Sequence, residues 1–269
     1  MPLRFVPATS VSLVDYAAAF SAGFRGYLLP FSMDAGALAR RVRLGQYDLE
    51  NSLLAYEGDE VAGVAALAVR GEEGWVAGFG VVPERRGAGV GREMMAALVE
   101  RARACGLRHL SLEVLKGNEA ARRLYESAGM RATRDLLIME RAGAGGGTTL
   151  DEAKPGELLW HFARLHAVRP AWQRDLPSLL AARLDGYRLG PADAPRAYAL
   201  VGRGPDAAPY VSDLAAEDAP AARELCRGLA GLAPVLKLIN EPEDGLFVEP
   251  LRESGFVETT RQHELHMDL

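Results

Sequence analysis

The sequence predicts an α/β fold of the α+β kind, built as two domains. Its 269 residues are enough for two ordinary domains. An apolar run at 74–82 leads directly into a helical apolar stripe, which predicts a strand, a tight turn and an amphipathic helix. A glycine-rich stretch near the middle is followed by a second half in which strand and helix patterns recur in a similar order.

Composition narrows the class of protein. Hydrophobic residues make up 49% and charged residues 25% of the chain, as in soluble globular proteins. The net charge is −5, so we expect no nucleic-acid partner, while mild acidity is compatible with a cationic amine substrate. The N-terminus has no signal-peptide layout and no apolar run is long enough to span a membrane, so we expect a cytoplasmic protein with no membrane partner.

The first half begins with elements that suit a sheet covered by helices. We expect helices at 11–25 and 34–44, the second capped by Asp34, and strands at 3–6, 52–56, 61–69, 75–82 and 110–115. The turn at 57–60 joins two strands as a hairpin, so the sheet begins antiparallel. The strand–helix–strand segment from 75 to 115 is expected to be a right-handed parallel crossover.

The turn between strand 75–82 and the following helix carries Gly87, Gly89 and Gly91. Pro83 ends the strand because it offers no N–H to a ladder. Small residues allow a ligand to approach the backbone, and a helix N-terminus presents free N–H groups with a partial positive charge. Arginines 85, 86 and 92 add positive charge. The turn therefore predicts a pyrophosphate site.

Two common phosphate loops do not fit this turn. A Walker A loop needs Gly-Lys-Ser/Thr, whereas Gly91 is followed by Arg92 and Glu93. A dinucleotide fingerprint needs a third glycine where Arg92 stands.

What remains, Arg86-x-x-Gly89-x-Gly91, resembles the acyl-CoA pyrophosphate loop of the GNAT N-acetyltransferase superfamily. A second stretch, from Asn118 through Leu124-Tyr125 to Gly129-Met130, is similar to the second GNAT signature, Asn-x-x-Ala-x-x-Leu-Tyr-x-x-x-Gly-Phe, with Met130 in place of Phe. The resemblance covers residues 1 to about 141. It implies a mixed, largely antiparallel sheet with a central splayed pair of parallel strands, flanked by helices.

The resemblance also implies an activity, the transfer of acetyl from acetyl-CoA to a primary amine by direct attack, with no metal. The implied coenzyme contacts are Val81, Val82, Arg86, Gly87, Ala88, Gly89, Val90, Gly91, Arg92, Asn118 and Tyr125. A backbone N–H near Val81 or Val82 would stabilise the carbonyl oxygen. Tyr125 matches the tyrosine that protonates the coenzyme A sulfur, with core packing as its alternative. Asn118 also suits a helix N-cap.

The acceptor side of the site is less constrained by the sequence. Glu113 matches a candidate base of ribosomal-protein N-terminal acetyltransferases, although a solvated strand glutamate or proton transfer to water fits equally. In GNAT enzymes the loop between the first two helices forms one wall of the acceptor pocket. That places Phe24, Tyr27 and Phe31 beside the substrate, with a hydrophobic plug as the alternative.

The second half resembles a degenerate copy. The expected domains are 1–141 and 150–269, joined by a glycine-rich linker at 142–149. The sequence of segment 250–256 is similar to that of segment 124–130. Strands are expected at 197–202, 210–214 and 235–239, with a helix at 220–229. No cradle glycines precede that helix, Glu217 and Asp218 would repel a pyrophosphate, and Leu251 replaces the tyrosine. We therefore expect a structural role for this domain.

Some alternatives stay open at this point. Cys105 and Cys226 are expected to be buried free thiols, and the spacing of His161 and His166 argues against a metal site. A non-catalytic acyl-CoA-binding module and a protein N-terminal acetyltransferase are the alternative functions. The acceptor is a small-molecule amine or a peptide N-terminus, and a homodimer is left open.

Overall fold

The computed structural model describes residues 2–29, 31–143, 148–204 and 208–269, which fall into two compact units. The first unit holds residues up to Thr133 together with His263–Leu269, and the second holds Arg134–Gln262. Residues 144–147 of the expected linker lie outside the described residues. No helix in the described ranges is long and apolar enough to cross a membrane.

The first unit is built on a mixed sheet. Its strands follow in the order β1 (Leu3–Pro7), β2 (Tyr47–Glu57), β3 (Glu60–Arg70), β4 (Glu73–Val81), β5 (His109–Leu115) and the end of β12 (Val257–Asp268). The first four strands pair antiparallel, and β4 pairs with β5 in parallel. That parallel pairing ends at Trp75 and Ser111, although β4 continues to Val81. The two strands therefore splay apart, as the resemblance to the GNAT superfamily implies.

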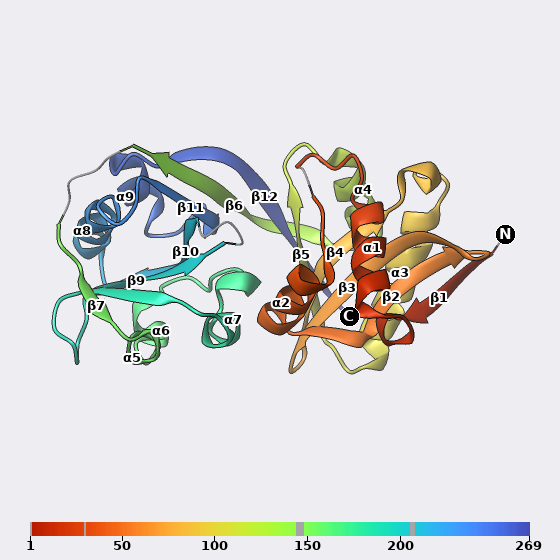
Figure 1. Ribbon diagram of the computed structural model, residues 1–269, viewed down its shortest axis with the longest axis horizontal. Coiled ribbons are helices and arrows are strands. Elements are labelled where there is room, and N and C mark those ends of the chain that lie inside the picture. The colour runs from red at the N-terminus through yellow and green to blue at the C-terminus, as the bar shows by residue number, and fades with distance from the viewer. Residues whose placement is uncertain (1, 30, 144–147, 205–207) are drawn as a thin grey trace. The chain divides into compact units, whose positions relative to one another are not determined.

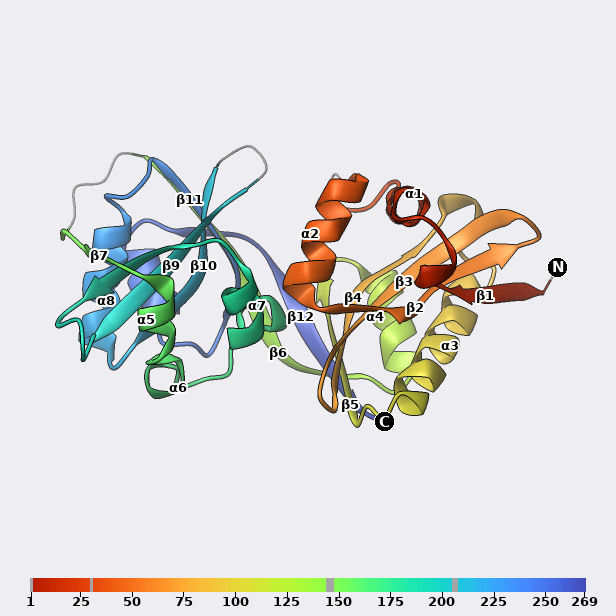
Figure 2. The same cartoon turned by 60° about the horizontal axis from the view of Figure 1, so that its bottom comes forward.

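Helices cover both faces of this sheet (Figures 1 and 2). One face carries α1 (Leu13–Gly23) and α2 (Ala35–Gly45), and the other carries α3 (Val90–Ala104) and α4 (Glu119–Ser127). Asp34 caps α2 as predicted, because its Oδ1 accepts the N–H of Ala37 at 2.7 Å. Cys105 is exposed, contrary to expectation, because it caps the end of α3 and does not continue its buried stripe.

A bulge in β4 sets which side chains face which helices. Ala66 pairs with Gly78 and Leu67 with Val76, so Ala77 has no cross-strand partner. A Cβ added to Gly78 would lie 2.6 Å from Phe20 of α1, which places this position on the α1 face. Val76 and Phe79 pack instead with the α3 core.

The C-terminal end of the chain belongs to the core of the first unit. Leu265 is fully buried in the same cluster as Leu98 and Leu112. The N–H of Leu269 donates to the carbonyl oxygen of Arg108 at 2.9 Å. The sequence-based division placed all of 150–269 in the second domain, whereas contacts group 263–269 with the first unit. The reason is that β12 is 12 residues long and extends beyond the second unit.

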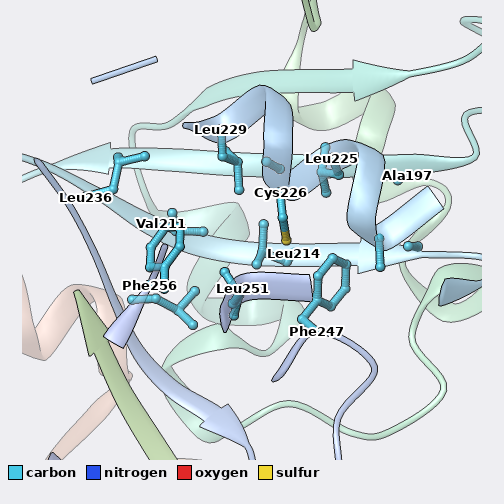
Figure 3. Close-up of a cluster of buried hydrophobic side chains, with 14 of the residues drawn as sticks. Ala197, Val211, Leu214, Leu225, Cys226, Leu229, Leu236, Phe247, Leu251 and Phe256 are labelled. Atoms are coloured by element: carbon cyan, nitrogen blue, oxygen red, sulfur yellow. The ribbon is translucent and has the colours of Figure 1, made fainter. Parts of the chain in front are cut away.

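The second unit repeats this plan with different chemistry. Its strand order is β6 (Arg131–Ala142), β11 (Val235–Pro242), β10 (Pro209–Ala216), β9 (Ala197–Arg203), β8 (Asp185–Leu189) and β7 (Asp151–Ala153). Helices α8 (Ala219–Leu229) and α9 (Val248–Glu253) pack on one face through the cluster that contains Leu214, Leu225, Cys226, Leu251 and Phe256 (Figure 3). Cys226 is buried there, as predicted.

The parallel pair of the second unit also splays. Strands β10 and β11 pair only at Tyr210–Lys237 and Val211–Leu238. A register shift between Val211 and Asp213 puts a bulge in β10, as in β4. The second unit therefore retains the opening between its two parallel strands.

Candidate active site

The glycine turn forms an open array of backbone donors. A short 3-10 helix (Pro83–Arg85) precedes it, and Gly89 is the N-cap of α3. Gly87 has a φ of +79° and Gly89 a φ of +89°, and a Cβ added at either would meet nothing within 4 Å. Only glycine adopts this backbone without strain.

Several N–H groups of the turn have no protein acceptor. The N–H groups of Arg92 and Glu93 both donate to the carbonyl oxygen of Gly89. Those of Gly87, Ala88 and Gly89 find no acceptor in the described part of the chain, and Val90 and Gly91 are in the first helical turn, where donors are unpaired by geometry. Free donors at a helix N-terminus suit an anion such as a phosphate.

The three arginines around the turn have different partners. Arg85 pairs with Glu57 at 2.6 Å and with Glu60 at 3.6 Å. Arg86 donates to the carbonyl oxygens of Val81, Gly23 and Arg25 at 2.9, 3.1 and 2.7 Å, so it fastens the turn to the end of α1. Arg92 is exposed and makes no ion pair within the described ranges. The coenzyme contact of Arg86 stays a prediction, and its hydrogen bonds to the three carbonyl oxygens were not predicted from the sequence.

Two further positions of the signatures have packing roles. A Cβ on Gly91 would lie 3.2 Å from Leu124 Cδ2, so this glycine allows α3 to pack closely on α4. Asn118 caps α4, because its Oδ1 accepts the N–H of Ala121 at 3.3 Å. The capping alternative for Asn118 is thus observed, and capping does not prevent a contact with coenzyme.

One backbone N–H of the splayed strand points to the open edge. Val82, which is buried, donates its N–H to the carbonyl oxygen of Ala62 at 3.0 Å and so directs it toward β3. Successive residues of a strand direct their N–H groups to opposite edges. The N–H of Val81 therefore points toward the edge from which β5 has diverged, which makes Val81 the better candidate of the two for holding an oxyanion.

Tyr125 is a buried phenol on α4, 6% exposed. Its ring packs edge-on against Phe79 of β4, with centroids 5.9 Å apart. Burial, and secondarily Tyr27, raise the pKa of Tyr125 well above the ordinary value for tyrosine. The phenol is therefore protonated at neutral pH and can act as a proton donor.

Tyr27 connects the acceptor loop to this region. Burial raises the pKa of Tyr27, and its hydrogen bond with Asn118 opposes that rise. Tyr27 also packs edge-on against Phe24 at 5.2 Å, and Phe24 lies 4.5 Å from Phe31. The structure thus brings the three predicted acceptor-side residues together in one aromatic cluster. That arrangement suits both a pocket wall and a hydrophobic plug.

The aromatic cluster lies against β4. A Cβ added to Gly80 would lie 3.0 Å from Phe24 Cδ2 and equally close to the backbone of Gly23. The absence of a side chain at Gly80 therefore lets the loop after α1 approach the strand closely. This places Phe24 on the α1 face of β4, in the part of the strand that no longer pairs with β5.

Glu113 of β5 has a partner that the sequence did not indicate. Trp75 of β4 donates its Nε1–H to Glu113 Oε2 at 2.8 Å. Trp75 packs edge-on on Tyr47, with centroids 6.3 Å apart, and both rings are buried. A half-buried carboxylate with one oxygen held by an indole is a positioned group. Alternation placed Glu113 on its face of the strand, but only the β4–β5 register reveals Trp75.

Metal ligands do not gather in the described ranges, where no three His, Cys, Asp or Glu side chains are close enough to hold an ion.

The sequence matches one family model and one curated relative over part of its length. The model of the Acetyltransferase (GNAT) family matches residues 24–130. The uncharacterized N-acetyltransferase YycN of Bacillus subtilis (strain 168) is 40% identical over 70 residues, which are 26% of this chain and 44% of that protein. The chain thus matches less than half the length of this relative.

Solved structures share the fold over nearly the whole chain. A GCN5-related N-acetyltransferase from Sphaerobacter thermophilus has a TM-score of 0.73 at 16% identity, covering 99% of this chain and 95% of its own. A tandem GNAT protein from the clavulanic acid biosynthesis pathway has a TM-score of 0.69 at 16% identity, covering 99% and 98%. A putative acetyltransferase from Pyrococcus horikoshii has a TM-score of 0.70 at 15% identity, covering 100% and 89%. Likeness at these identities establishes the fold.

Proposed function

We propose that this chain, whose residues 24–130 belong to the GNAT acetyltransferase family, moves the acetyl group of acetyl-CoA to a primary amine by direct attack. The observation that carries the proposal is the array of unpaired N–H groups at Gly87–Gly91, next to two splayed strands and a protonated tyrosine. A small-molecule amine and a peptide N-terminus are the two acceptor classes considered.

In this proposal, the residues of the first unit have separate roles in binding acetyl-CoA and in stabilising the developing charge. The turn at 87–91 and the exposed Arg92 bind the pyrophosphate, and the open edge of β4 from Val76 to Val81 receives the pantetheine arm. Acetyl-CoA supplies the acetyl thioester. The N–H of Val81 stabilises the carbonyl oxygen as negative charge develops.

Proton transfers complete the reaction. A neutral amine forms the new C–N bond while the C–S bond breaks. The phenol of Tyr125 donates its proton to the leaving thiolate. Glu113, held by Trp75, takes the proton that the attacking nitrogen must lose. No cysteine serves as a nucleophile, since Cys105 caps the end of α3 opposite the glycine turn and Cys226 is buried in the second unit.

The test is thermal unfolding with and without acetyl-CoA. At about a hundredfold excess over the dissociation constant, acetyl-CoA should stabilise the wild type by about 2.7 kcal/mol. Gly89→Glu should abolish this stabilisation. Gly106→Glu is the matched control, because Gly106 also has a positive φ, +85°, and open space around it, but follows the other end of α3.

The alternatives predict different results. If Gly89→Glu and Gly106→Glu lose the stabilisation by acetyl-CoA equally, the loss results from backbone strain and does not place the coenzyme at the glycine turn. A wild type that saturating acetyl-CoA fails to stabilise contradicts the proposal. Stabilisation without turnover of any amine or peptide would instead identify a non-catalytic acyl-CoA-binding module.

A further inference from the structure

Helix α2 carries a cation to the aromatic cluster of the acceptor loop. Arg41 lies in the second half of α2, and its guanidinium carbon is 5.6 Å from the centre of the Phe31 ring. A guanidinium at this distance over a ring is held by a cation–π contact. The Phe31 ring in turn packs on Phe24 at 4.5 Å, and Phe24 reaches β4 at Gly80. Arg41 is therefore joined to residues that the proposed function places beside the acceptor.

The same guanidinium also meets the aromatic residues that hold Glu113. Arg41 donates a hydrogen bond to the hydroxyl oxygen of Tyr47. Arg41 and Gly45 are four residues apart, so they lie on one face of α2. A Cβ added to Gly45 would lie 2.5 Å from Tyr47 and 3.5 Å from Trp75, which places both rings under that face. Trp75 donates to Glu113, so a continuous set of contacts runs from Arg41 to the candidate base.

The charge of Arg41 is available to a ligand. Its side chain is exposed to solvent and makes no ion pair within the described ranges. Its contacts with Phe31 and Tyr47 are both to uncharged groups, so they hold the guanidinium in place without neutralising it. A guanidinium has five N–H donors in one plane, and those that Tyr47 does not use can bind both oxygens of a carboxylate. A side chain that is already held loses less entropy when the ligand arrives.

We propose that the acceptor is an amine that also carries a carboxylate, with its nitrogen at Glu113 and its carboxylate at Arg41. This inference rests on the proposed acetyl transfer and names its acceptor class. An acceptor with a second ammonium group would meet the like charge of Arg41, and a plain alkylamine would leave the guanidinium to water. The aromatic rings that join the two charged groups give the connecting carbon chain an apolar surface. A free amino acid and a peptide with an acidic residue after its N-terminus share this chemistry.

The experiment measures kcat and KM of the full chain for matched acceptors. The amino carboxylates are β-alanine, γ-aminobutyrate and ε-aminocaproate. Each is compared with the alkylamine that has a methyl group in place of the carboxylate, and with the diamine that has an aminomethyl group there. Two peptides that begin with Ala-Glu and with Ala-Gln test the second source of the same chemistry.

The variants are Arg41→Glu and Arg41→Gln, with Arg40→Glu as the matched control. Arg40 is exposed on the same helix, next to Arg41, and contacts no aromatic ring in the described part of the chain. Arg40→Glu therefore makes the same change in net charge at a neighbouring position without removing the guanidinium from the aromatic cluster. Every variant should keep its stabilisation by acetyl-CoA in thermal unfolding, which shows that it is folded, and two substitutions at Arg41 guard against one that is not.

At least one amino carboxylate should have a kcat/KM about tenfold or more above that of its matched alkylamine, since hydrogen bonds to charged groups contribute this much. The preference should appear in KM, because the carboxylate takes no part in bond making. Arg40→Glu should keep the preference, Arg41→Gln should lose it, and Arg41→Glu should prefer the diamine. A preference found only between the Ala-Glu and Ala-Gln peptides would assign the carboxylate to a peptide acceptor.

Two results would overturn this inference while acetyl transfer stands. One is a wild type that acetylates alkylamines or diamines as well as amino carboxylates and the Ala-Glu peptide. The other is a preference that Arg40→Glu and Arg41→Glu reduce equally, which would reflect the net charge of the helix and not a site at Arg41. Stabilisation by acetyl-CoA without turnover of any acceptor would contradict acetyl transfer itself, and this inference with it.

Discussion

At the scale of single residues, Tyr125 is the sharpest test of the proposed chemistry. Tyr125→Phe keeps the ring that packs on Phe79 but removes the proton donor. We expect kcat to fall by about a hundredfold, since a positioned general acid typically contributes this much or more. Stabilisation by acetyl-CoA should be unchanged. Because the pKa of Tyr125 is raised, the phenol stays protonated throughout the assay range, and the loss should be the same from about pH 6 to 9.

Steady-state rates with the best amine, measured against pH, check this expectation. Tyr56→Phe serves as the control, because Tyr56 lies on β2 under the guanidinium of Arg4 and not on α4. A Tyr125→Phe enzyme with wild-type kcat would assign this residue to core packing alone.

At the scale of elements, variants of Arg86 and Arg92 distinguish the hydrogen bonds that hold the glycine turn in place from the positive charge that the turn presents to a ligand. Arg86→Ala removes three hydrogen bonds that hold the turn to the end of α1, and should lower the free energy of unfolding by about 1–3 kcal/mol. Arg92→Ala removes an exposed guanidinium and should leave unfolding unchanged. Both variants should bind acetyl-CoA more weakly than the wild type. Only the loss of affinity in Arg92→Ala should become steadily smaller as the salt concentration rises.

Denaturant unfolding and acetyl-CoA titration at several salt concentrations distinguish the two variants. Equal stability of Arg86→Ala and wild type would show that water replaces the guanidinium at these carbonyl oxygens without cost. A salt-independent loss in Arg92→Ala would contradict its role as a charge for the pyrophosphate.

Elements also show how far sequence reasoning extends. The α2 cap at Asp34, the glycine turn and the β4–β5 crossover depend on neighbours in the chain, so local pattern was enough to predict them. The hydrogen bond between Trp75 and Glu113, which are 38 residues apart in the sequence, depends on the register of β4 and β5, and periodicity does not determine that register. Arg86 was assigned to the ligand because its charge is visible in sequence, whereas the three carbonyl oxygens that it binds are not.

At the scale of the whole molecule, the return of the chain to the first unit could not be foreseen from the pattern. The segment after Gln262 follows the second copy in sequence, yet Leu265 is buried in the core of the first unit, with Met267 and Leu269 packed partly against it. His109 Nδ1 lies 2.8 Å from Asp268 Oδ1, which ties the same end to the start of β5. The second copy is therefore the segment through which the first unit obtains its last strand.

A fragment of residues 1–141 tests that dependence. It contains both signatures and every predicted coenzyme contact, but leaves β5 without its neighbour β12. Losing the burial of Leu265 alone should cost about 1.5–3 kcal/mol, and the exposed edge of β5 favours aggregation. We expect weaker acetyl-CoA binding and a lower unfolding midpoint than in the full chain, both restored in part by a peptide of residues 257–269. The same peptide with Leu265→Asp should restore nothing, whereas Val257→Asp, at a position 63% exposed on the same strand, should act like the unchanged peptide. A fragment that binds acetyl-CoA as tightly and unfolds as late as the full chain would show that the first unit is stable without β12.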